Sequence, residues 1–244
     1  MIHIEIKINA IYNMDCLDGM KLIPDKSIDM ILCDLPYGTT KCKWDTVIPF
    51  EPLWEQYERI IKDNGVIALT ASQPFTTKLI NSNINLFKYE WIWEKSKATG
   101  FALCNKRPMK AHENVCIFYK KQPTYNPQKT EGKPYKQRLG TQESKEFSTG
   151  TKRNDNTTGL RYPRSVVYFK TAESEGKQVH PTQKPLALFE YLINTYTNEG
   201  ELVLDNCIGS GTTAIACLNT NRNYIGFELD EKYYKTAVDR INNA

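Results

Sequence analysis

Leu202-Val-Leu-Asp-Asn-Cys-Ile-Gly-Ser-Gly-Thr-Thr213 is the stretch that decides the fold of this 244-residue chain. It is typical of a strand, a tight turn around Gly209 and Gly211, and a helix that begins at Thr212. Glycine lets a backbone turn sharply and approach a ligand closely. Such a unit usually opens a nucleotide-binding α/β sheet. Here only one further strand and helix follow, so N-terminal strands must complete the sheet, as in a circularly permuted fold.

The rest of the chain alternates between strand-like and helix-like segments. This alternation indicates an α/β fold with a doubly wound, mostly parallel sheet. Runs rich in Ile, Val and aromatic residues predict seven strands, at 10–15, 27–33, 65–71, 89–93, 114–119, 201–205 and 224–228. Helices are predicted at 16–23, 52–61, 74–81, 185–194, 212–219 and 231–241.

Charge and composition divide the chain. Residues 122–177 contain 11 Lys/Arg and 6 Asp/Glu, a net charge of +5 (11 − 6), whereas the whole chain carries +4, which leaves −1 (4 − 5) for the rest. The segment is also poor in apolar residues, so we expect a loop-rich insertion at 122–178 between two parts of one catalytic domain, 1–121 and 179–244. A basic segment on a near-neutral body is typical of phosphate-backbone binding. A solvated loop is the alternative.

Membrane proteins and zinc proteins are poor matches to the sequence. No apolar run approaches the roughly 18–20 residues of a membrane span, and the N-terminus alternates like a strand, unlike a signal peptide. The seven cysteines form no Cys-x-x-Cys pair. We therefore expect free thiols in a reducing cytoplasm and no metal site.

Acidic residues follow three of the predicted strands. Asp205, before the glycine turn, is suited to hold an ammonium group, and Glu228 ends the next strand, where an acid accepts from ribose hydroxyls. Asp15 follows the first strand and either accepts from an adenine amino group or caps the next helix. The turn also fits nicotinamide and flavin sites. S-adenosylmethionine, which has the ribose but no pyrophosphate, matches the acids better.

Asp34-Leu-Pro-Tyr37 directly follows the apolar run at 28–33. It places an acceptor side chain, a proline turn and an aromatic ring at the end of a predicted strand. These groups suit a site that holds a planar base while its exocyclic amino group reacts. Tyr37 as a core aromatic is the alternative, and the neighbouring Pro36 and Gly38 favour the turn.

Together these segments resemble the β group of DNA amino-methyltransferases, which modify adenine N6 or cytosine N4. In that group the catalytic motif comes first, the target-recognition region second and the cofactor motif last. Here the matching segments are 34–40, 180–185, 205–213 and 226–230. The resemblance implies a methyltransferase-type sheet with S-adenosylmethionine as cofactor. Leu35 departs from the family's usual Pro, but the family uses this residue mainly through its backbone, so the resemblance implies that Leu is tolerated.

The resemblance also implies roles for individual residues. Asp34 and the carbonyl of Leu35 or Pro36 would accept the hydrogens of the target amino group, and Tyr37 would stack on a base flipped out of the duplex. The cofactor would contact Asp15, Cys16, Asp34, His180, Thr182, Lys184, Pro185, Asp205, Asn206, Cys207, Gly209, Ser210, Gly211, Thr212, Glu228 and Leu229.

Basic and aromatic residues are the candidates for contacts with DNA. Three of them, Lys41, Lys43 and Trp44, follow the catalytic turn, where a solvated loop fits equally well. The others are Lys106, Arg107, Tyr125, Arg138, Arg161, Tyr162, Arg164 and Lys170. Sequence does not separate base readers from phosphate contacts among them.

The sequence therefore predicts a methyltransferase that acts on adenine N6 at a short defined site in double-stranded DNA. Asp at position 34 favours adenine, as the resemblance implies, and cytosine N4 is the near alternative. RNA and protein-glutamine methyltransferases usually have the reverse motif order. An inactive nucleic-acid-binding module is disfavoured by the intact acids. A homodimer and a functionally paired restriction endonuclease are further partners that the resemblance suggests.

Overall fold

The computed structural model describes residues 5–39, 45–136, 155–175 and 183–243. The chain forms two compact units. The first, Met1–Asn126 with Ser165–Ala244, contains all the helices and strands of the described residues. The second, Pro127–Arg164, is held by two isolated antiparallel bridges, Thr130 with Arg161 and Tyr135 with Asn156.

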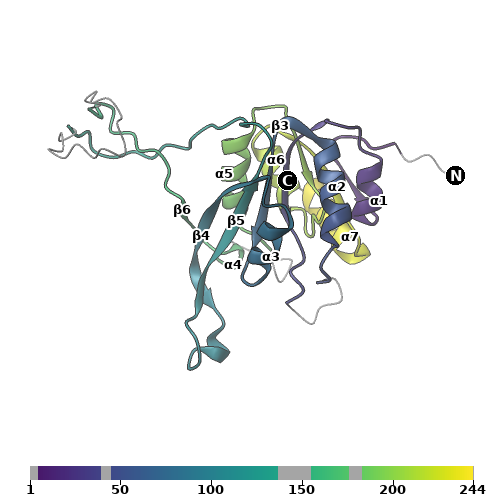
Figure 1. Ribbon diagram of the computed structural model, residues 1–244, viewed down its shortest axis with the longest axis horizontal. Helices are drawn as coiled ribbons and strands as arrows, with labels where there is room; N and C mark the ends of the chain where they lie inside the picture. The colour runs from purple at the N-terminus through teal and green to yellow at the C-terminus, as the bar shows by residue number, and fades with distance from the viewer. Residues whose placement is uncertain (1–4, 40–44, 137–154, 176–182, 244) are drawn as a thin grey trace. The chain divides into compact units, whose positions relative to one another are not determined.

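The first unit is built on one sheet with the strand order β1-β8-β7-β2-β3-β5-β4-β6. Figure 1 shows β3, β5, β4 and β6 of this sheet. Neighbouring strands are parallel except that β5 is antiparallel to both β3 and β4. The strands are β1 (Ala10–Asn13), β2 (Ile28–Asp34), β3 (Ile61–Ala71), β4 (Phe87–Thr99), β5 (Lys110–Phe118), β6 (Val166–Phe169), β7 (Leu202–Asp205) and β8 (Asn223–Glu228). The predicted mostly parallel α/β sheet is thus confirmed.

The predicted number of seven strands is wrong, because the described residues form a sheet of eight. The additional strand is β6, which pairs in parallel with β4 from Ile92 with Val166 to Lys95 with Phe169. Its four residues are too short to give a clear alternation, and they follow a long polar segment. For these reasons the sequence favoured a loop.

The permuted arrangement is confirmed by the neighbours of β7. This strand lies between β8 and the N-terminal β2, with Met30 opposite Val203 and Ile31 opposite Leu204. The glycine turn that follows β7 is therefore central in the sheet although it comes late in the sequence.

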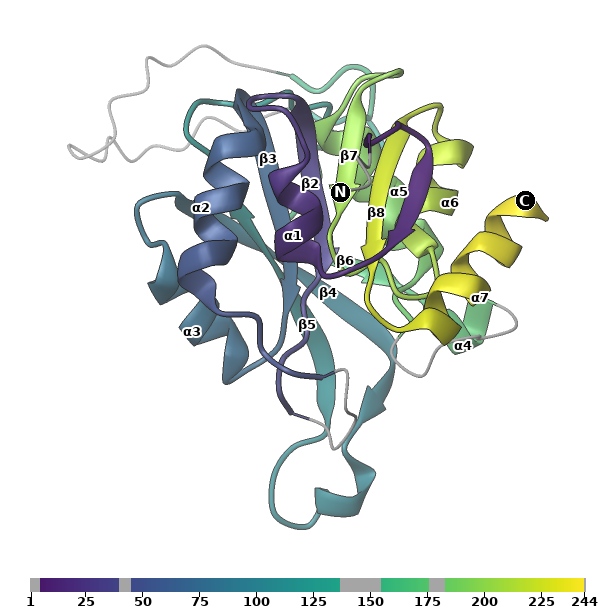
Figure 2. The same ribbon diagram turned by 90° about the vertical axis from the view of Figure 1, so that its right-hand side faces the viewer.

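Helices cover both faces of the sheet (Figure 2). On one face lie α1 (Cys16–Lys21), α2 (Phe50–Ile60) and α3 (Phe75–Ser82), and on the other α5 (Leu186–Tyr196), α6 (Thr212–Asn219) and α7 (Glu231–Asn242). Helix α2 buries Leu53, Trp54, Tyr57 and Ile60, a spacing of three to four residues that keeps one stripe toward the sheet. A short α4 (Ala172–Glu175) follows β6.

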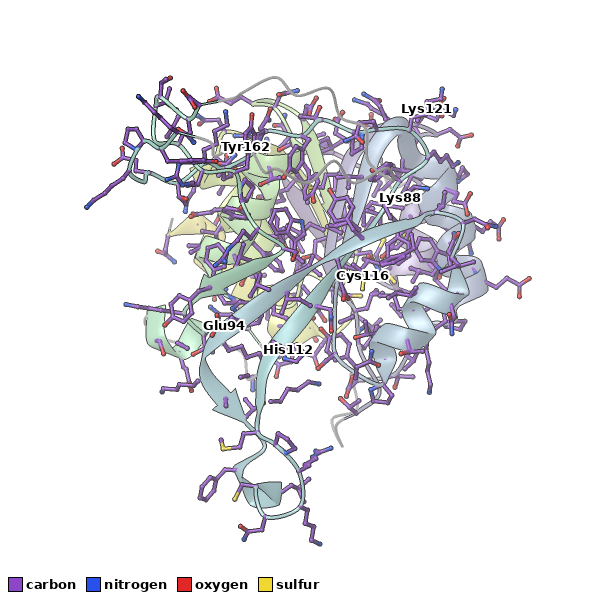
Figure 3. The ribbon with its side chains drawn as sticks, turned by 60° about the vertical axis from the view of Figure 1, so that its left-hand side comes forward. Lys88, Glu94, His112, Cys116, Lys121 and Tyr162 are labelled. Carbon is purple, nitrogen blue, oxygen red and sulfur yellow. The ribbon has the colours of Figure 1, made fainter. Side chains whose placement is uncertain are left out.

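Strands β4 and β5 form a hairpin whose connecting loop projects beyond the rest of the sheet (Figure 3). Glu94 and His112 face each other in its register. The loop carries the 3₁₀ turn η1 (Phe101–Leu103). Within the described residues, no helix has the length and apolar character needed to cross a membrane.

Candidate active site

The carboxyl ends of β7 and β2 lie side by side and mark the topological switch point of the sheet. Strand β7 leads into α6 on one face, whereas β2 leads to α2 on the other. Ligands of open α/β sheets bind in the crevice that such a divergence creates. A cavity of about 1230 Å³ lies there, lined by strand ends, the glycine turn and the outer part of the β4–β5 hairpin.

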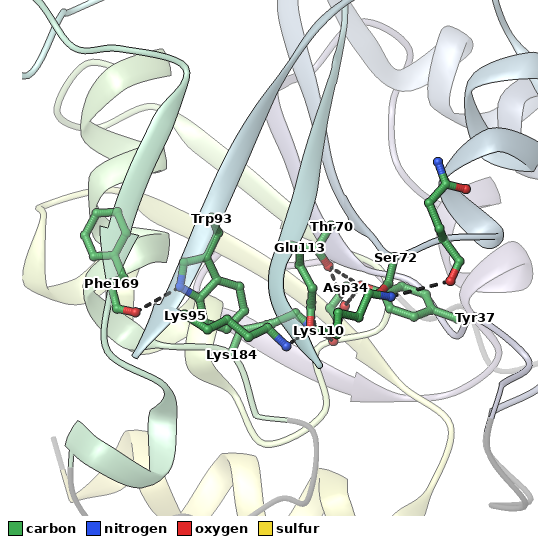
Figure 4. Close-up of polar contacts among 11 residues, drawn as sticks. Asp34, Tyr37, Thr70, Ser72, Trp93, Lys95, Lys110, Glu113, Phe169 and Lys184 are labelled. Carbon is green, nitrogen blue, oxygen red and sulfur yellow. Dashed lines mark hydrogen bonds and ion pairs between the residues drawn. The ribbon is translucent and has the colours of Figure 1, made fainter. Parts of the chain in front are cut away.

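Asp34, the last residue of β2, projects into this cavity (Figure 4). Its Oδ1 accepts hydrogen bonds from the Tyr37 hydroxyl at 2.8 Å and from the Thr70 hydroxyl. Its Oδ2 accepts from Lys184 Nζ at 2.6 Å. Both carboxylate oxygens therefore have donors, while the side chain keeps 22% of its surface exposed.

Tyr37 is fixed by contacts at both its ring and its hydroxyl. The ring stacks on Phe75 of α3 with centroids 5.0 Å apart and planes 25° from parallel. Lys184 Nζ lies 5.5 Å from the ring centroid. Desolvation, followed by the charge of Asp34, raises the pKa of Tyr37, so the hydroxyl stays protonated and donates to Asp34. The partly buried ring packs against the hydrophobic core and also lines the cavity.

An ion-pair network extends from Asp34 to the hairpin. Lys184 Nζ also lies 3.4 Å from Oε2 of Glu113 on β5, and Lys95 on β4 pairs with Glu113 Oε1. All three of these side chains are at least 88% buried. Burial opposes the charge on Lys184, but the Asp34 and Glu113 carboxylates outweigh it and raise the pKa of Lys184. Burial likewise opposes the charge on Glu113, and Lys184 and Lys95 outweigh it and lower the pKa of Glu113.

The glycine turn after β7 is held from two sides. Glu228, at the end of β8, accepts from the backbone N–H of Gly209 at 2.9 Å and of Asp230 at 2.8 Å. Arg240 of α7 donates to the Ser210 carbonyl at 2.5 Å. Gly211 has φ +83°, a conformation that favours glycine, and a Cβ there would lie only 3.2 Å from Ala237 Cβ.

Asp205 is more deeply buried than its predicted role suggests, with 3% of its surface exposed. One oxygen accepts from the backbone N–H of Cys207 at 3.0 Å and the other from the Thr213 hydroxyl. Burial raises the pKa of Asp205 to about 7, although these hydrogen bonds act against the shift. Asp205 still lines the cavity, so it touches the ligand space with a small part of its surface.

Asp15 and Cys16 line the cavity beside the end of β1, and Cys33 is buried in β2. Asp15 caps α1 by accepting from the backbone N–H of Leu17 at 2.8 Å, and it also lines the cavity, so the helix-cap interpretation holds without excluding the other. A hydrogen bond with Cys207, followed by burial, raises the pKa of Cys16. Burial raises the pKa of Cys33 to about 12. These thiols stay protonated and are poor nucleophiles.

The predicted cofactor residues separate into three groups. His180 and Thr182 lie outside the described residues. Pro185 caps α5, and Gly211 precedes α6, and neither lines the cavity. The other twelve line it: Asp15, Cys16, Asp34, Lys184, Asp205, Asn206, Cys207, Gly209, Ser210, Thr212, Glu228 and Leu229.

The predicted DNA-contacting residues are dispersed. Lys106 and Arg107 are exposed in the hairpin loop. In the second unit Arg164 is exposed, whereas the Arg161 guanidinium donates to two carbonyls and stacks over Tyr135 at 4.5 Å. Tyr125, Tyr162 and Lys170 are exposed. The remaining candidates, Lys41, Lys43, Trp44 and Arg138, lie outside the described residues.

Three polar residues around Asp34 were missed from the sequence. Thr70 ends in the site because β3 pairs with β2 in register, with Thr70 opposite Asp34. Glu113 and Lys95 arrive from the antiparallel hairpin. The sequence did contain a signal for the two charged residues, because Glu113 and Lys95 lie within apolar strands. Buried charges are rarely found without a partner, so each indicates a paired site.

Known proteins share both the sequence pattern and the fold of this chain. The pattern of a DNA methylase family, N6_N4_Mtase, matches residues 28–239. The type II methyltransferase M1.MboII of Moraxella bovis is 28% identical, over 97% of this chain and 98% of its own length. The type II methyltransferase M.HpaI of Haemophilus parainfluenzae is 26% identical, over 94% of this chain and 73% of its own length.

Two solved structures show the same architecture. The M1.HpyAVI–SAM complex has a TM-score of 0.65 at 24% identity, with 94% of this chain and 98% of that chain covered. The PvuII DNA methyltransferase, described as cytosine-N4-specific, has a TM-score of 0.69 at 16% identity, with 97% and 87% covered. These similarities confirm the predicted methyltransferase-type fold.

Proposed function

This chain belongs to the DNA methylase family N6_N4_Mtase, and we propose that it methylates the N6 amino group of adenine at a defined site in double-stranded DNA. The family membership establishes the coarser activity, which is methyl transfer to an amino group of a DNA base, either adenine N6 or cytosine N4. The adenine assignment, base flipping and the roles of individual residues belong to the proposal.

S-adenosylmethionine fits the charge of the cavity. Its sulfonium and ammonium groups are cationic, and acidic side chains outnumber basic ones in the lining, with Asp15, Asp34, Asp45, Glu113, Glu173, Asp205, Glu228 and Asp230 against Lys95, Lys97 and Lys184. The pyrophosphate of a dinucleotide would meet unfavourable charge in the same place. When bound, S-adenosylmethionine supplies an electrophilic methyl group. The M1.HpyAVI–SAM complex shows that a protein of this fold holds it.

We assign cofactor contacts to three acids at neighbouring strand ends. Glu228 would accept from ribose hydroxyls while it holds the glycine turn through Gly209. Asp205 would receive the ammonium group, and Asp15 the adenine amino group of the cofactor. All three line the one cavity described above.

Asp34 carries the chemistry that we propose for the target base. The lone pair of an adenine amino nitrogen is delocalised into the ring, which makes the nitrogen a poor nucleophile. An acceptor at Asp34, with the carbonyl of Leu35 or Pro36, would favour a more tetrahedral nitrogen and stabilise its developing positive charge. The nitrogen would take the methyl group and release one proton to solvent, so no enzyme nucleophile would be needed.

The target base would reach Asp34 only after leaving the duplex, because its amino group is stacked inside DNA. Tyr37 is the proposed stacking partner, and its position on the cavity wall supports this role. Stacking on an aromatic ring offsets roughly 1–3 kcal/mol of the cost of flipping.

The β4–β5 hairpin is the part of the first unit best suited to hold DNA near the cavity. Residues 95–110 contain five Lys/Arg and no Asp/Glu. Lys97 and Thr99 line the cavity, and the exposed Lys106 and Arg107 follow a few residues later. Phosphate contacts would position the duplex so that a flipped base enters beside Asp34. The second unit, within the predicted recognition region 122–178, is proposed to read the target sequence.

The single observation that supports this function most is the Asp34 carboxylate in an acid-lined cavity beside the glycine turn. The test is to incubate unmethylated genomic DNA with the protein and isotope-labelled S-adenosylmethionine, and to identify labelled nucleosides by mass spectrometry. We expect labelled N6-methyladenine. Labelled N4-methylcytosine alone would refute the adenine assignment and leave the mechanism intact, because both bases present two N–H donors on a six-membered ring.

A further inference from the structure

The acceptor that the target amino group needs is already in use. Asp34 Oδ1 binds the hydroxyls of Tyr37 and Thr70, and Oδ2 binds Lys184 Nζ at 2.6 Å (Figure 4). These donors take three of the about four acceptor positions of the carboxylate, so a base that donates to Oδ2 shares this oxygen with the Lys184 ammonium group. The identity of the donor that leaves decides how the site is activated.

Lys184 is the donor best able to move. Tyr37 is held by its stack on Phe75, and Thr70 is 1% exposed on a central strand that pairs on both sides. The Lys184 ammonium group, by contrast, ends a flexible chain of four methylenes. It lies near a second carboxylate, that of Glu113.

Glu113 is positioned to accept a hydrogen bond from this ammonium group in place of Asp34. Its Oε2 is buried and, within the described part of the chain, is the one buried side-chain polar atom without a hydrogen bond. Lys184 Nζ is 3.4 Å from it, which is an ion-pair distance but too long for a good charged hydrogen bond. Lys95 binds the other oxygen and fixes the orientation of the carboxylate. A small shift of the Lys184 ammonium group completes the missing hydrogen bond.

We propose that Lys184 exchanges partners when the target base enters, leaving Asp34 Oδ2 for Glu113 Oε2, and that Glu113 is the positioning residue for this exchange. This inference rests on the proposed function, because Asp34 must be the acceptor of the target amino group. Without the base, Lys184 shields Asp34 and neutralises its charge. With the base, the amino group takes the position that the ammonium group leaves.

The exchange also serves the transition state. Positive charge develops on the amino nitrogen during methyl transfer, and an ammonium group hydrogen-bonded to Asp34 would repel it. The four charges in the network, Asp34, Glu113, Lys95 and Lys184, sum to zero, so the network stays neutral when Lys184 moves toward Glu113, and Asp34 keeps its two hydroxyl donors.

Glu113→Gln tests the exchange, because glutamine keeps the shape but not the charge that attracts Lys184. The matched control is Glu94→Gln, which changes an exposed residue on the same hairpin, opposite His112 (Figure 3). Single-turnover methylation of unmethylated genomic DNA is measured with labelled S-adenosylmethionine, and cofactor binding is measured by calorimetry. We expect Glu113→Gln to slow the single turnover about 10- to 100-fold, as for loss of a charged hydrogen bond, with cofactor affinity changed less than about twofold. The control should match the parent.

The pH profile and a double variant separate positioning from a general structural role. Without Glu113 the Lys184 ammonium group loses its proton more easily, so the Glu113→Gln rate should recover from about pH 7 to about pH 10 more than the parent rate does. Adding Lys184→Met to Glu113→Gln removes the competitor for Asp34 and should restore part of the rate. Should Glu113→Gln fail to fold, Glu113→Asp withdraws the carboxylate by one methylene and carries the same expectation.

Two results would overturn the inference. One is a Glu113→Gln rate equal to that of the parent. The other is a loss that is constant with pH and unrelieved by Lys184→Met. Absence of DNA methylation by the parent protein would instead refute the proposed function, so the two failures are distinguishable.

Discussion

Replacing the buried carboxylate of Asp205 should change how stability depends on pH. Burial raises the pKa of Asp205 from 3.8 to about 7 in the folded state. A raised carboxyl pKa means that the folded protein binds the proton more tightly than the unfolded chain. This contribution to stability is complete below the unfolded pKa and is lost as pH rises through the folded pKa. Asp205 therefore makes the protein less stable at pH 8 than at pH 5.

The size of the effect follows from the two pKa values. Between about pH 5 and about pH 8, the Asp205 contribution to the free energy of unfolding falls by about 2.5 kcal/mol. Asp205→Asn has no proton to lose, so this part of the pH dependence should vanish. The substitution also disturbs the hydrogen bonds from Cys207 and Thr213, but that loss is common to both pH values and cancels in the comparison.

Urea unfolding of the parent and of Asp205→Asn at about pH 5 and about pH 8 measures this difference. We expect the parent to lose about 2.5 kcal/mol more than the variant does over that interval. Glu94→Gln, which removes an exposed carboxylate, should follow the parent. Equal changes in the parent and in Asp205→Asn would refute the reasoning, because Asp205 would then hold no excess proton in the folded protein.

Three further experiments test other parts of the proposed function. Asp34→Ala should slow methyl transfer by a factor of about 100 or more in a single-turnover assay. Cofactor affinity should be largely kept, because the lost acceptor acts on the amino nitrogen. A variant that kept a tenth of the parent's rate would contradict this role of Asp34. Tyr37→Phe should slow methyl transfer by about tenfold, because it removes the hydroxyl that donates to Asp34. Tyr37→Ala should slow transfer further, because it also removes the stacking ring. Equal effects of the two substitutions would assign the role to the hydroxyl alone. The double variant Lys106→Ala with Arg107→Ala should bind DNA more weakly. The slope of log affinity against log salt concentration should fall by about one unit per lost phosphate contact. An unchanged slope would exclude the hairpin loop from the DNA interface.

The parts of the site that lie along single strands were predictable from the sequence. Apolar runs ending in an acid placed Asp34, Asp205 and Glu228 at strand ends, and the parallel sheet brought those ends to one cavity. The position of the glycine turn near the C-terminus also predicted that N-terminal strands complete the sheet, and β2 does so beside β7.

The network around Asp34 could not be predicted in the same way. Glu113 and Lys95 lie near Lys184 only because β5 pairs antiparallel with β3 and β4 pairs with β5. No local pattern encodes that pairing, since the contacts join residues far apart in the chain. The burial of Asp205 also depends on a contact that the strand pattern does not predict. The Thr213 hydroxyl, in the first turn of α6, donates a hydrogen bond to the Asp205 carboxylate.

The predicted element boundaries deviate most where tertiary pairing extends a strand beyond its apolar run. Strand β4 was expected at 89–93 and spans Phe87–Thr99, because pairing with β5 continues through the polar residues of the hairpin. Strand β6 lies within the predicted insertion, because its four residues have too little pattern to indicate a strand. Sequence alone gives the core of an element more reliably than its partners.

The most direct test of the central claim is to identify the nucleoside that the protein modifies. Unmethylated genomic DNA is incubated with isotope-labelled S-adenosylmethionine and either the parent protein or Asp34→Ala, then digested to nucleosides for mass spectrometry. We predict labelled N6-methyladenine with the parent and almost none with Asp34→Ala. The absence of any labelled methylated nucleoside with the parent would contradict the central claim.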